Sequence, residues 1–453
     1  MDLSVRNKRV VIAGSCCLVI VVLGEIYTFS RNHETRARAF RAHFVILVEI
    51  ILYFISKFIW NNLIHIKEKH IIEPEVVSDH QAHRLKWQTA MEWILLIYIG
   101  LVHTSYLTNF FLMGREPHWF AMLAYSALGF HFQLATGLGI LKLFQVALRF
   151  IKYRSNNLAD GLICRPVDKV SKRRTAILAL VYAFLATAFG IYKAAQIPEV
   201  KKVMIPIQDL QRSWEGARIV QISDIHLGPT VGWTKLNAIV DVINSLRPDI
   251  VVVTGDLVDG SMRLLEDAVS PLTRVRSKYG NFFVTGNHEY YTGDVDNWLI
   301  KLEYELGFKP LHNSNVKVIP EEGDESDEIC VAGTDDIDAD LLGYTGHGFN
   351  INGALHSCDD TKPVIVLAHQ PKAAKALLQS QYRVDLVLAG HTHGGQFFPV
   401  LIGVYLVNPF FSGLYQYGRS HVYVSTGTQY WGVPLRLGSS MEITEITLHR
   451  ATE

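Results

Sequence analysis

The chain has 453 residues, enough for two domains, and its 43 basic residues balance its 43 acidic residues. A formal charge of zero argues against a protein that holds nucleic acid by general electrostatic attraction, so no nucleic-acid duplex is expected as a partner. Hydrophobic residues make up 49% of the chain, and their excess lies in residues 1–195, which predicts a membrane region followed by a separate domain over residues 200–453.

Long apolar runs fill the first region. A helix needs about 20 mostly apolar residues to cross a bilayer, and five runs approach or exceed that length: residues 10–29, 43–60, 91–113, 119–150 and 175–192. The first run could instead be a cleaved signal peptide, but its core is long and no small-residue cleavage site follows it. The sequence therefore predicts an integral, multi-pass helical transmembrane bundle of about five spans.

Several polar residues lie within or near these runs: Glu25, Glu49, Lys57, Glu92, His131 and Gln133. Such residues can mark a transport pathway, or they can snorkel at helix ends and join neighbouring helices. Most of them lie near the ends of the runs, and no repeat relates the runs to one another. We therefore expect a structural role for them rather than transport.

Basic residues between the runs predict the orientation of the chain, because positively charged loops stay on the cytoplasmic side. The loop at residues 152–174 is the most basic, whereas the loop before residue 119 carries only Arg115. With five spans, the N-terminus is then cytoplasmic and the second half of the chain is extracytoplasmic. One arginine cluster conflicts with this orientation, since it would also lie outside: Arg31, Arg36, Arg38 and Arg41.

The five cysteines are too few and too scattered for a disulfide scaffold, and no cluster has the spacing of a zinc site. Cys330 and Cys358 could pair if the second half of the chain faces an oxidising compartment. Because the two residues are isolated in the sequence, two unpaired thiols are the simpler expectation.

From about residue 200, short β-rich runs alternate with charged helical stretches and glycine-rich turns, which is typical of an α/β domain. Buried strands are expected at residues 219–222, 250–254, 282–285, 364–368 and 386–389. Each of these runs ends in a cluster of polar residues. Side chains at the ends of such strands commonly meet in one crevice, where they bind ligands or take part in catalysis.

The polar side chains at these strand ends are those of aspartate, asparagine and histidine: Asp224, His226, Asp256, Asn287, His288, His369, His391 and His393. Residues i and i+2 of an extended segment share a face, so each of the two pairs spaced in this way can direct both side chains toward one metal ion. A set of ligands without cysteine suits the borderline divalent metals Mn, Fe and Zn.

Each piece has a plainer explanation when it stands alone. Asp256 follows a glycine and could be a turn residue, and His369 could be an ordinary core histidine. His391 and His393, which lie between glycines, form the most specific piece. Five separate segments nevertheless place a ligand-type side chain directly after an apolar strand, and agreement at that many positions favours a metal site.

Five segments carry a resemblance to a known family: SDIHLG from residue 223, TGDLVDG from residue 254, TGNHE from residue 285, LAHQP from residue 367 and GHTHGGQ from residue 390. In this order they resemble the calcineurin-like metallophosphoesterases, over a region from about residue 200 to the C-terminus. The resemblance implies an α/β domain built as a two-sheet β-sandwich flanked by helices. It implies nothing specific about the membrane spans.

By this resemblance, two divalent ions would share the site. One set of ligands would be Asp224, His226, Asp256 and His393, and the other would be Asp256, Asn287, His369 and His391, with Asp256 bridging the ions. His288 is implied to be catalytic rather than a ligand, stabilising the phosphoryl group or protonating the leaving oxygen. Asp259 and Glu289 would orient the histidines.

The implied function is a membrane-bound hydrolase that cleaves phosphate esters, with two divalent metal cations activating water. Phosphodiesters, phosphomonoesters and pyrophosphates all suit such a centre, so the substrate stays open. The alternative is a catalytically weak membrane receptor or scaffold that uses the domain to bind a ligand. The complete set of ligand-type residues, with His288 present, favours the enzyme.

A dense apolar and aromatic segment, residues 397–415, follows His391 and His393. It could be a buried strand or packing segment of the domain, which is the plainer expectation. It could also form an apolar wall beside the metals at the level of the lipid headgroups, because aromatic residues favour the membrane interface. The second interpretation predicts membrane lipids as neighbours and a substrate with a lipid portion.

Overall fold

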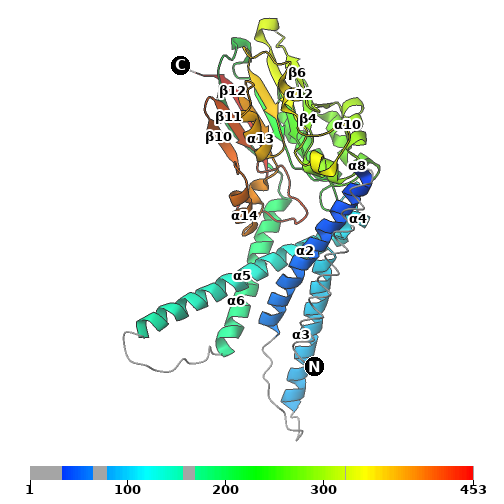
Figure 1. Ribbon diagram of the computed structural model, residues 1–453. Coiled ribbons are helices and arrows are strands. Elements are labelled where there is room, and N and C mark those ends of the chain that lie inside the picture. Colours follow the sequence, from blue (N-terminus) through cyan, green and yellow to red (C-terminus); the bar gives the residue numbers. More distant parts are fainter. Residues whose placement is uncertain (1–32, 65–78, 157–168, 322, 452–453) are drawn as a thin grey trace.

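The computed structural model describes residues 33–64, 79–156, 169–321 and 323–451 (Figure 1). Long helices gather at one end of the molecule, and two β-sheets lie at the other end. The helical end contains α2 (His33–Leu63), α3 (Asp79–His103), α4 (Thr108–Phe111), α5 (Trp119–Asn156) and α6 (Lys169–Ala195).

Three helices of the described residues are long and apolar enough to cross a membrane: His33–Leu63, Trp119–Leu148 and Lys172–Ala195. They coincide with the second, fourth and fifth apolar runs of the sequence. The first run, residues 10–29, lies outside the described residues. The described part of the chain therefore does not reach the predicted number of about five spans.

The third run, residues 91–113, does not form the continuous helix that the sequence predicted. Helix α3 begins earlier, at Asp79, and ends at His103. The chain turns there, and the hydroxyls of Thr104 and Ser105 bond to backbone carbonyl oxygens three residues earlier, at 2.7 and 2.8 Å. Such side-chain bonds offer the backbone an alternative to a continued helix.

Polar side chains connect the long helices. The hydroxyl of Ser56 in α2 lies 3.2 Å from Nε2 of His103 and 3.1 Å from Nε2 of His131. Nδ1 of His103 contacts the carboxylate of Glu49. Gln133 of α5 donates to a backbone oxygen of the sheet-containing half at 2.8 Å. These contacts agree with the structural role expected for polar residues between helices.

Helix α5 has 38 residues, more than a bilayer requires. Its first half packs on the sheet-containing half of the molecule. The ring of Phe132 lies 5.8 Å from the ring of Phe397, and a Cβ added at Gly129 would lie 3.0 Å from Val433. One hydrophobic cluster therefore includes residues from both ends of the molecule.

The other end of the molecule contains two six-stranded sheets. The strand order of the first sheet is β1 (Glu199–Ile207), β12 (Glu442–Arg450), β2 (Arg218–Ile222), β3 (Ile250–Thr254), β4 (Asn281–Val284) and β5 (Lys309–Pro310). The order of the second sheet is β10 (Gly413–Tyr417), β11 (Ser420–Val424), β9 (Leu386–Ala389), β8 (Val364–Leu367), β7 (Ile329–Gly333) and β6 (Ser314–Val318).

Helices cover the outer faces of both sheets. One hydrophobic cluster joins the first sheet to α7 (Trp233–Ser245), α8 (Met262–Val269) and α10 (Val295–Tyr304). A second cluster lies between the sheets, and a third joins the second sheet to α12 (Ile351–Leu355) and α13 (Pro371–Leu378). This order of layers confirms the predicted two-sheet sandwich, and every residue of β3, β8 and β9 is buried.

The segment 397–415 does not form one buried strand, although Phe397 and Phe410 pack in hydrophobic clusters, as expected of a packing segment. Its middle forms helix α14 (Val400–Val407), in which no residue is buried. Phe397, just before this helix, is buried, whereas Leu406 is 74% exposed. Figure 1 shows α14 on the side of the sheets that faces the long helices. The segment therefore presents an apolar helix toward the membrane half of the molecule.

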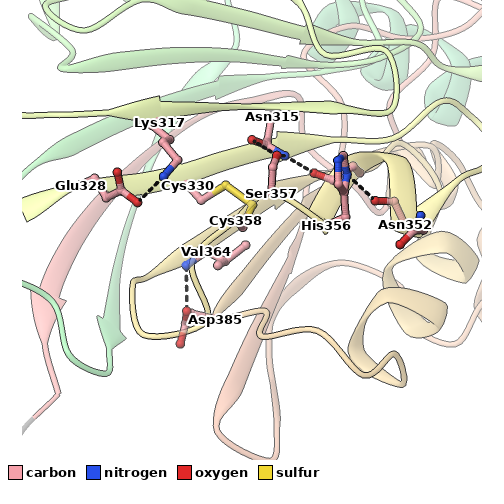
Figure 2. The surroundings of a disulfide bond; sticks show 11 residues. Asn315, Lys317, Glu328, Cys330, Asn352, His356, Ser357, Cys358, Val364 and Asp385 are labelled. Atoms are coloured by element: carbon pink, nitrogen blue, oxygen red, sulfur yellow. Dashed lines mark hydrogen bonds and ion pairs between the residues drawn. A yellow bond between two sulfur atoms is a disulfide. The ribbon is translucent and has the colours of Figure 1, made fainter. Parts of the chain in front are cut away.

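A disulfide joins Cys330 and Cys358 (Figure 2), so the expectation of two unpaired thiols is wrong. Cys330 lies in β7, and α12 packs against β6 and β7. The turn after α12 thus brings Cys358 to a Cα–Cα distance of 5.7 Å from Cys330. The side chain of Asn315 in β6 donates to Ser357 at 2.8 Å and holds the same turn. The sequence separation of 28 between the cysteines concealed this proximity in the sequence.

Candidate metal centre

The predicted ligands lie at the ends of strands. Most of them directly follow one: Asp224 after β2, Asp256 after β3, Asn287 after β4, His369 after β8 and His391 after β9. Strands β2, β3 and β4 are parallel neighbours, as are β8 and β9, so their carboxyl ends lie side by side. The two sheets thereby bring residues from distant parts of the sequence to one edge of the sandwich.

The backbone has an uncommon conformation at most of these positions. Five predicted ligands have a left-handed backbone: Asp224 with φ 56°, His226 with φ 51°, Asp256 with φ 55°, His391 with φ 72° and His393 with φ 51°. This conformation costs a residue with a side chain about 1–3 kcal/mol. Such strain persists where the surroundings impose it, and it is concentrated at functional sites.

Asp224, His226 and His393 form one buried group whose ligand atoms all lie within 4.8 Å of one another. Nδ1 of His226 lies 2.8 Å from Oδ1 of Asp259, so this nitrogen carries the hydrogen and Nε2 presents a lone pair. That Nε2 is 3.0 Å from Nε2 of His393 and 3.6 Å from Oδ2 of Asp256. Lone pairs and carboxylate oxygens that converge in this way are suited to surround a cation.

Asp256, His369 and His391 form a second group within the same limit of 4.8 Å. Nδ1 of His369 donates to the backbone oxygen of Thr254 at 2.7 Å, and its Nε2 faces Oδ2 of Asp256 at 3.1 Å. Oδ1 of Asn287 lies 3.0 Å from Nδ1 of His391 and so adjoins the group. Burial raises the pKa of Asp256, but the histidines around it, His369 above all, hold that pKa well below its usual range.

Asp256 lies between the two groups, because the same oxygen, Oδ2, is 3.6 Å from Nε2 of His226 and 3.1 Å from Nε2 of His369. Its carboxylate is also buried, with only 3% of the side chain exposed. Two buried carboxylates, one amide oxygen and four histidines make a donor set that fits two borderline divalent metals. The arrangement therefore fits the two-ion centre that the family resemblance implies.

His288 stands beside these groups. Its Nδ1 lies 2.7 Å from Oδ1 of Asp259, and its ring centre lies 4.5 Å from that of His226. Burial lowers the pKa of His288, but the carboxylates of Asp256 and Asp259 outweigh burial and raise it to about 9. A protonated imidazole at this place could contact a phosphoryl oxygen or donate a proton.

The two acidic residues expected to orient histidines have different roles. Asp259 does contact histidines, because its Oδ1 lies within 2.8 Å of Nδ1 of both His226 and His288. Glu289 instead accepts the backbone N–H groups of Asp256 at 3.0 Å and of Gly286, which follows β4, at 2.7 Å. It therefore supports the loop that carries Asp256 rather than a histidine ring.

A cavity of about 480 Å³ opens beside the two groups, and sequence reasoning missed most of its walls. One wall contains His288 and several predicted ligands. The rest of the lining includes aromatic residues from the helical half and the C-terminal loops: Phe40, Phe44, Tyr106, Phe397 and Trp431. Phe397 belongs to the apolar segment that the sequence places after His393, whereas no motif or spacing in the sequence connects the other four residues with the strand ends.

Helix α2 reaches the site through aromatic contacts. The ring of Phe40 stacks on that of Tyr291 with centres 4.5 Å apart, and the ring of Phe44 lies 6.0 Å from that of Trp431. The ring of Trp431 in turn lies 5.4 Å from that of His288. A continuous row of aromatic rings thus extends from the membrane half to the candidate metal centre.

Arg41 is a further residue that the sequence did not assign to the site. It lines the cavity, and among the described residues its Nε is buried without a hydrogen-bond partner. Its guanidinium lies 5.9 Å from the ring centre of Phe110. The sequence did contain one indication, the arginine cluster that conflicted with the predicted orientation. Arginines that do not follow the pattern of cytoplasmic loops can instead belong to a binding site.

Comparison with known proteins agrees with this geometry. Residues 217–395 match a family model described as calcineurin-like phosphoesterase. The chain is 39% identical over 450 residues to a Danio rerio protein and 38% identical over 455 residues to a Bos taurus protein, both named transmembrane protein with metallophosphoesterase domain. Each alignment covers 99% of this chain and 99% of the relative.

A solved dimetal phosphatase from Danio rerio aligns at 15% identity with a TM-score of 0.33, over 47% of this chain and 88% of its own. That score is too low for a comparison of individual elements. The two relatives establish the family, because they match this chain at 39% and 38% identity over 99% of its length. Together with the match over the motif-bearing residues 217–395, they show that the chain belongs to the calcineurin-like phosphoesterase family.

Proposed function

We propose that this protein is a multi-pass membrane hydrolase that cleaves phosphate esters with a dinuclear metal centre. The proposed ligands are Asp224, His226 and His393 for one ion, Asn287, His369 and His391 for the other, and Asp256 between them. The observation that carries the proposal is the convergence of histidine nitrogens and buried carboxylates on two adjoining points. Burying these carboxylates and ring nitrogens together costs free energy unless cations neutralise the carboxylates.

The chemistry can be divided between the ions and the chain. Two divalent ions, when bound, supply Lewis acidity that polarises phosphoryl oxygens and makes water nucleophilic at neutral pH. His288 is proposed to contact the transferring phosphoryl group or to protonate the leaving oxygen. The contact of 2.7 Å between its Nδ1 and Asp259 leaves Nε2 to face the substrate and stabilises the protonated ring.

The proposed substrate carries a lipid portion. The cavity supports this, because much of its lining is apolar and comes in part from the membrane half. Helix α14 supports it as well, since Tyr405, Leu406 and Val407 are 62%, 74% and 66% exposed. An exposed apolar helix next to membrane-spanning helices is typical of a surface that enters the lipid headgroup region.

Arg41 is proposed to bind the phosphate of the substrate or an anionic group beside it. A guanidinium with a buried, unpartnered Nε in a largely apolar wall is costly unless an anion completes its hydrogen bonds. The planar fork of arginine matches the oxygens of a phosphate group. The membrane half would then contribute a substrate contact as well as an apolar wall.

The catalytic half is proposed to lie on the non-cytoplasmic side of its membrane. Lys172, Arg173 and Arg174 lie in the first turns of α6, and Ala195 at its other end leads into β1 (Figure 1). Because basic helix ends stay in the cytoplasm, the sheets belong on the opposite side. The disulfide between Cys330 and Cys358 supports the same assignment, since disulfides persist in oxidising compartments.

The arginines that conflicted with this orientation have a different explanation. A Cβ added at Gly343 would lie 2.0 Å from Nη1 of Arg36, so Arg36 packs against the sheet-containing half. Arg41 lines the cavity. Arg38 forms an exposed ion pair of 3.5 Å with Glu34. Arg31 lies outside the described residues. Two of the other three charges serve contacts with the catalytic half, which reduces the conflict with the positive-inside rule.

Turnover by the purified, detergent-solubilised chain tests the proposal. Supplied with Mn or Zn, the protein should hydrolyse an aryl phosphodiester and at least one lipid phosphate ester or pyrophosphate, and Asp256→Asn should hydrolyse none. Binding of two metal equivalents without turnover of a monoester, diester and pyrophosphate series would instead favour the receptor or scaffold alternative.

A further inference from the structure

Helix α14 differs from the helices that cover the two sheets. Its sequence is VLIGVYLV, and none of its eight residues is buried. By contrast, α7, α8 and α13 each bury at least three side chains against the sheets. A helix that is apolar on every side belongs in a protein core or in a membrane.

Close packing holds α14 against the loop of the candidate metal centre. A Cβ added at Gly395 would lie 2.2 Å from Cα of Leu401, so the helix rests directly on this glycine. Gly395 comes two positions after His393, a proposed ligand. The backbone oxygen of Phe398, just before α14, accepts from Gln133 of α5 at 2.8 Å. The helix therefore has a fixed place between the metal ligands and a long apolar helix of the membrane half.

The two sides of α14 have different surroundings. Val400 and Val404 line the cavity. Because these residues are four positions apart, they lie on the same side of the helix. Ile402 and Leu406 share another side in the same way, and they are 47% and 74% exposed. A single helix therefore separates the cavity from the exterior at this place.

An apolar surface connects the outer side of α14 with helix α6, which is long and apolar enough to cross a membrane. The rings of Tyr405 and Phe411 lie 5.5 Å apart. Phe411 in turn lines the same hollow as Phe189 of α6, and Figure 1 shows α14 close to that helix. Phe189 is itself 53% exposed. Lipid that surrounds α6 would continue onto this surface, so the bilayer is the partner that fits it.

We propose that α14 is embedded in the surface of the bilayer and that the lipid chain of the substrate enters the cavity sideways, past α14. The membrane side of the cavity is lined by Phe44 of α2, Phe132 of α5 and Val404 of α14. A chain that enters here stays in apolar surroundings and avoids the free-energy cost of passing through water. The inference rests on the proposed function only in taking the entering lipid to be the substrate.

Fluorescence quenching in vesicles tests the position of α14 without an activity assay. An NBD fluorophore is attached to Leu406→Cys in the full chain, which is reconstituted in phosphatidylcholine vesicles. Phosphatidylcholine with nitroxide groups on its acyl chains should quench this fluorophore strongly, whereas iodide in the water should quench it weakly. To keep the label at one position, the cysteines outside the disulfide are changed to serine: Cys16, Cys17 and Cys164.

The matched control is Ile319→Cys, because Ile319 is also apolar and is 41% exposed. It follows β6, which is antiparallel to β7, whereas β7 is parallel to β8. Ile319 therefore lies at the edge of the sandwich away from the metal ligands. Iodide should quench a fluorophore there, and the nitroxide lipid should not. Quenching of the Leu406 position by iodide alone would overturn the proposal.

Photo-crosslinking tests the path of the lipid chain. Phosphatidic acid with a diazirine in its acyl chain, mixed into the same vesicles, should form adducts with Phe44 inside the cavity as well as with Leu406 outside it. Val404→Trp should reduce the cavity adducts, because the larger ring narrows the passage. Ile402→Trp, on the outer side of the same helix, should not. Adducts with Leu406 alone would overturn entry past α14, as would equal cavity adducts in the two variants.

The failure of this proposal and the failure of the proposed function can be distinguished. If quenching and adducts are as expected but no phosphate ester is turned over, lipid entry past α14 stands and the proposed hydrolysis falls. If lipid phosphate esters are turned over but iodide reaches the Leu406 position, hydrolysis stands and entry past α14 falls.

Discussion

The Nε2 atoms of His226 and His393 lie 3.0 Å apart, although the two residues follow strands of different sheets. Asp259 accepts from Nδ1 of His226 at 2.8 Å, which turns the Nε2 lone pair of His226 toward His393. The contact exists because the carboxyl ends of both sets of parallel strands meet at one edge of the sandwich. Each of the two proposed ligand groups therefore draws its side chains from both sheets.

Replacing the shared carboxylate should disable the whole centre. We expect Asp256→Asn to abolish hydrolysis and to weaken the binding of both ions, because an amide cannot offset the repulsion between two divalent cations. Metal analysis and turnover of the purified variant measure both effects. Two tightly bound ions together with a near-normal rate would contradict the assignment of Asp256 as the bridging residue.

His288 should behave as a catalytic residue rather than as a ligand. We expect His288→Ala to lower turnover by roughly two to four orders of magnitude and to leave the metal content nearly unchanged. The reason is that its Nδ1 is engaged by Asp259 at 2.7 Å, beside the ligand groups. Loss of one metal equivalent in this variant would show that His288 is a ligand.

Arg41 should contribute to binding of the substrate anion. We expect Arg41→Gln to raise the Michaelis constant by roughly 10- to 100-fold, the value of a charge-assisted hydrogen bond of about 1.5–3 kcal/mol. Arg38→Gln is the matched control, because Arg38 lies on the same helix and its side chain is 73% exposed. Equal, small effects of both substitutions would mean that Arg41 does not touch the substrate.

The length of the substrate's lipid chain should affect its binding to the apolar lining of the cavity. We expect Phe44→Ala to raise the Michaelis constant for a long-chain substrate by roughly tenfold, with little effect on a short-chain analogue, since burying an aromatic ring contributes about 1.5–3 kcal/mol. Phe54→Ala is the control, because Phe54 lies on the same helix and is 62% exposed. Phe397 is a poorer probe, since its ring packs on Phe132 and its loss would disturb the fold.

The orientation can be decided on sealed membrane vesicles. We expect a tag at the C-terminus to be cut only by protease on the non-cytoplasmic side, because the basic turns of α6 lie at the opposite end of the helix from the sheets. As an independent readout, Cys330 and Cys358 should react with a maleimide only after reduction. Cleavage from the cytoplasmic side, with both thiols reactive at once, would show the reverse orientation.

The sequence by itself determined the local chemistry of the candidate centre. Asp224, Asp256 and His391 follow short apolar runs that the structure shows as β2, β3 and β9. Strand alternation and glycine turns are properties of a few neighbouring residues, so they can be predicted without knowledge of the fold. The order of these segments also led to the family and to the two-sheet sandwich.

Only the tertiary structure decided what surrounds that centre. It paired Cys330 with Cys358, ended helix α3 at His103 within the third apolar run, and brought Phe40 and Arg41 to the cavity. These results depend on packing between segments that are far apart in the chain. Since the entropy cost of closing a loop grows only slowly with its length, separation in the sequence says little about which distant residues meet, and packing of the folded chain makes that choice.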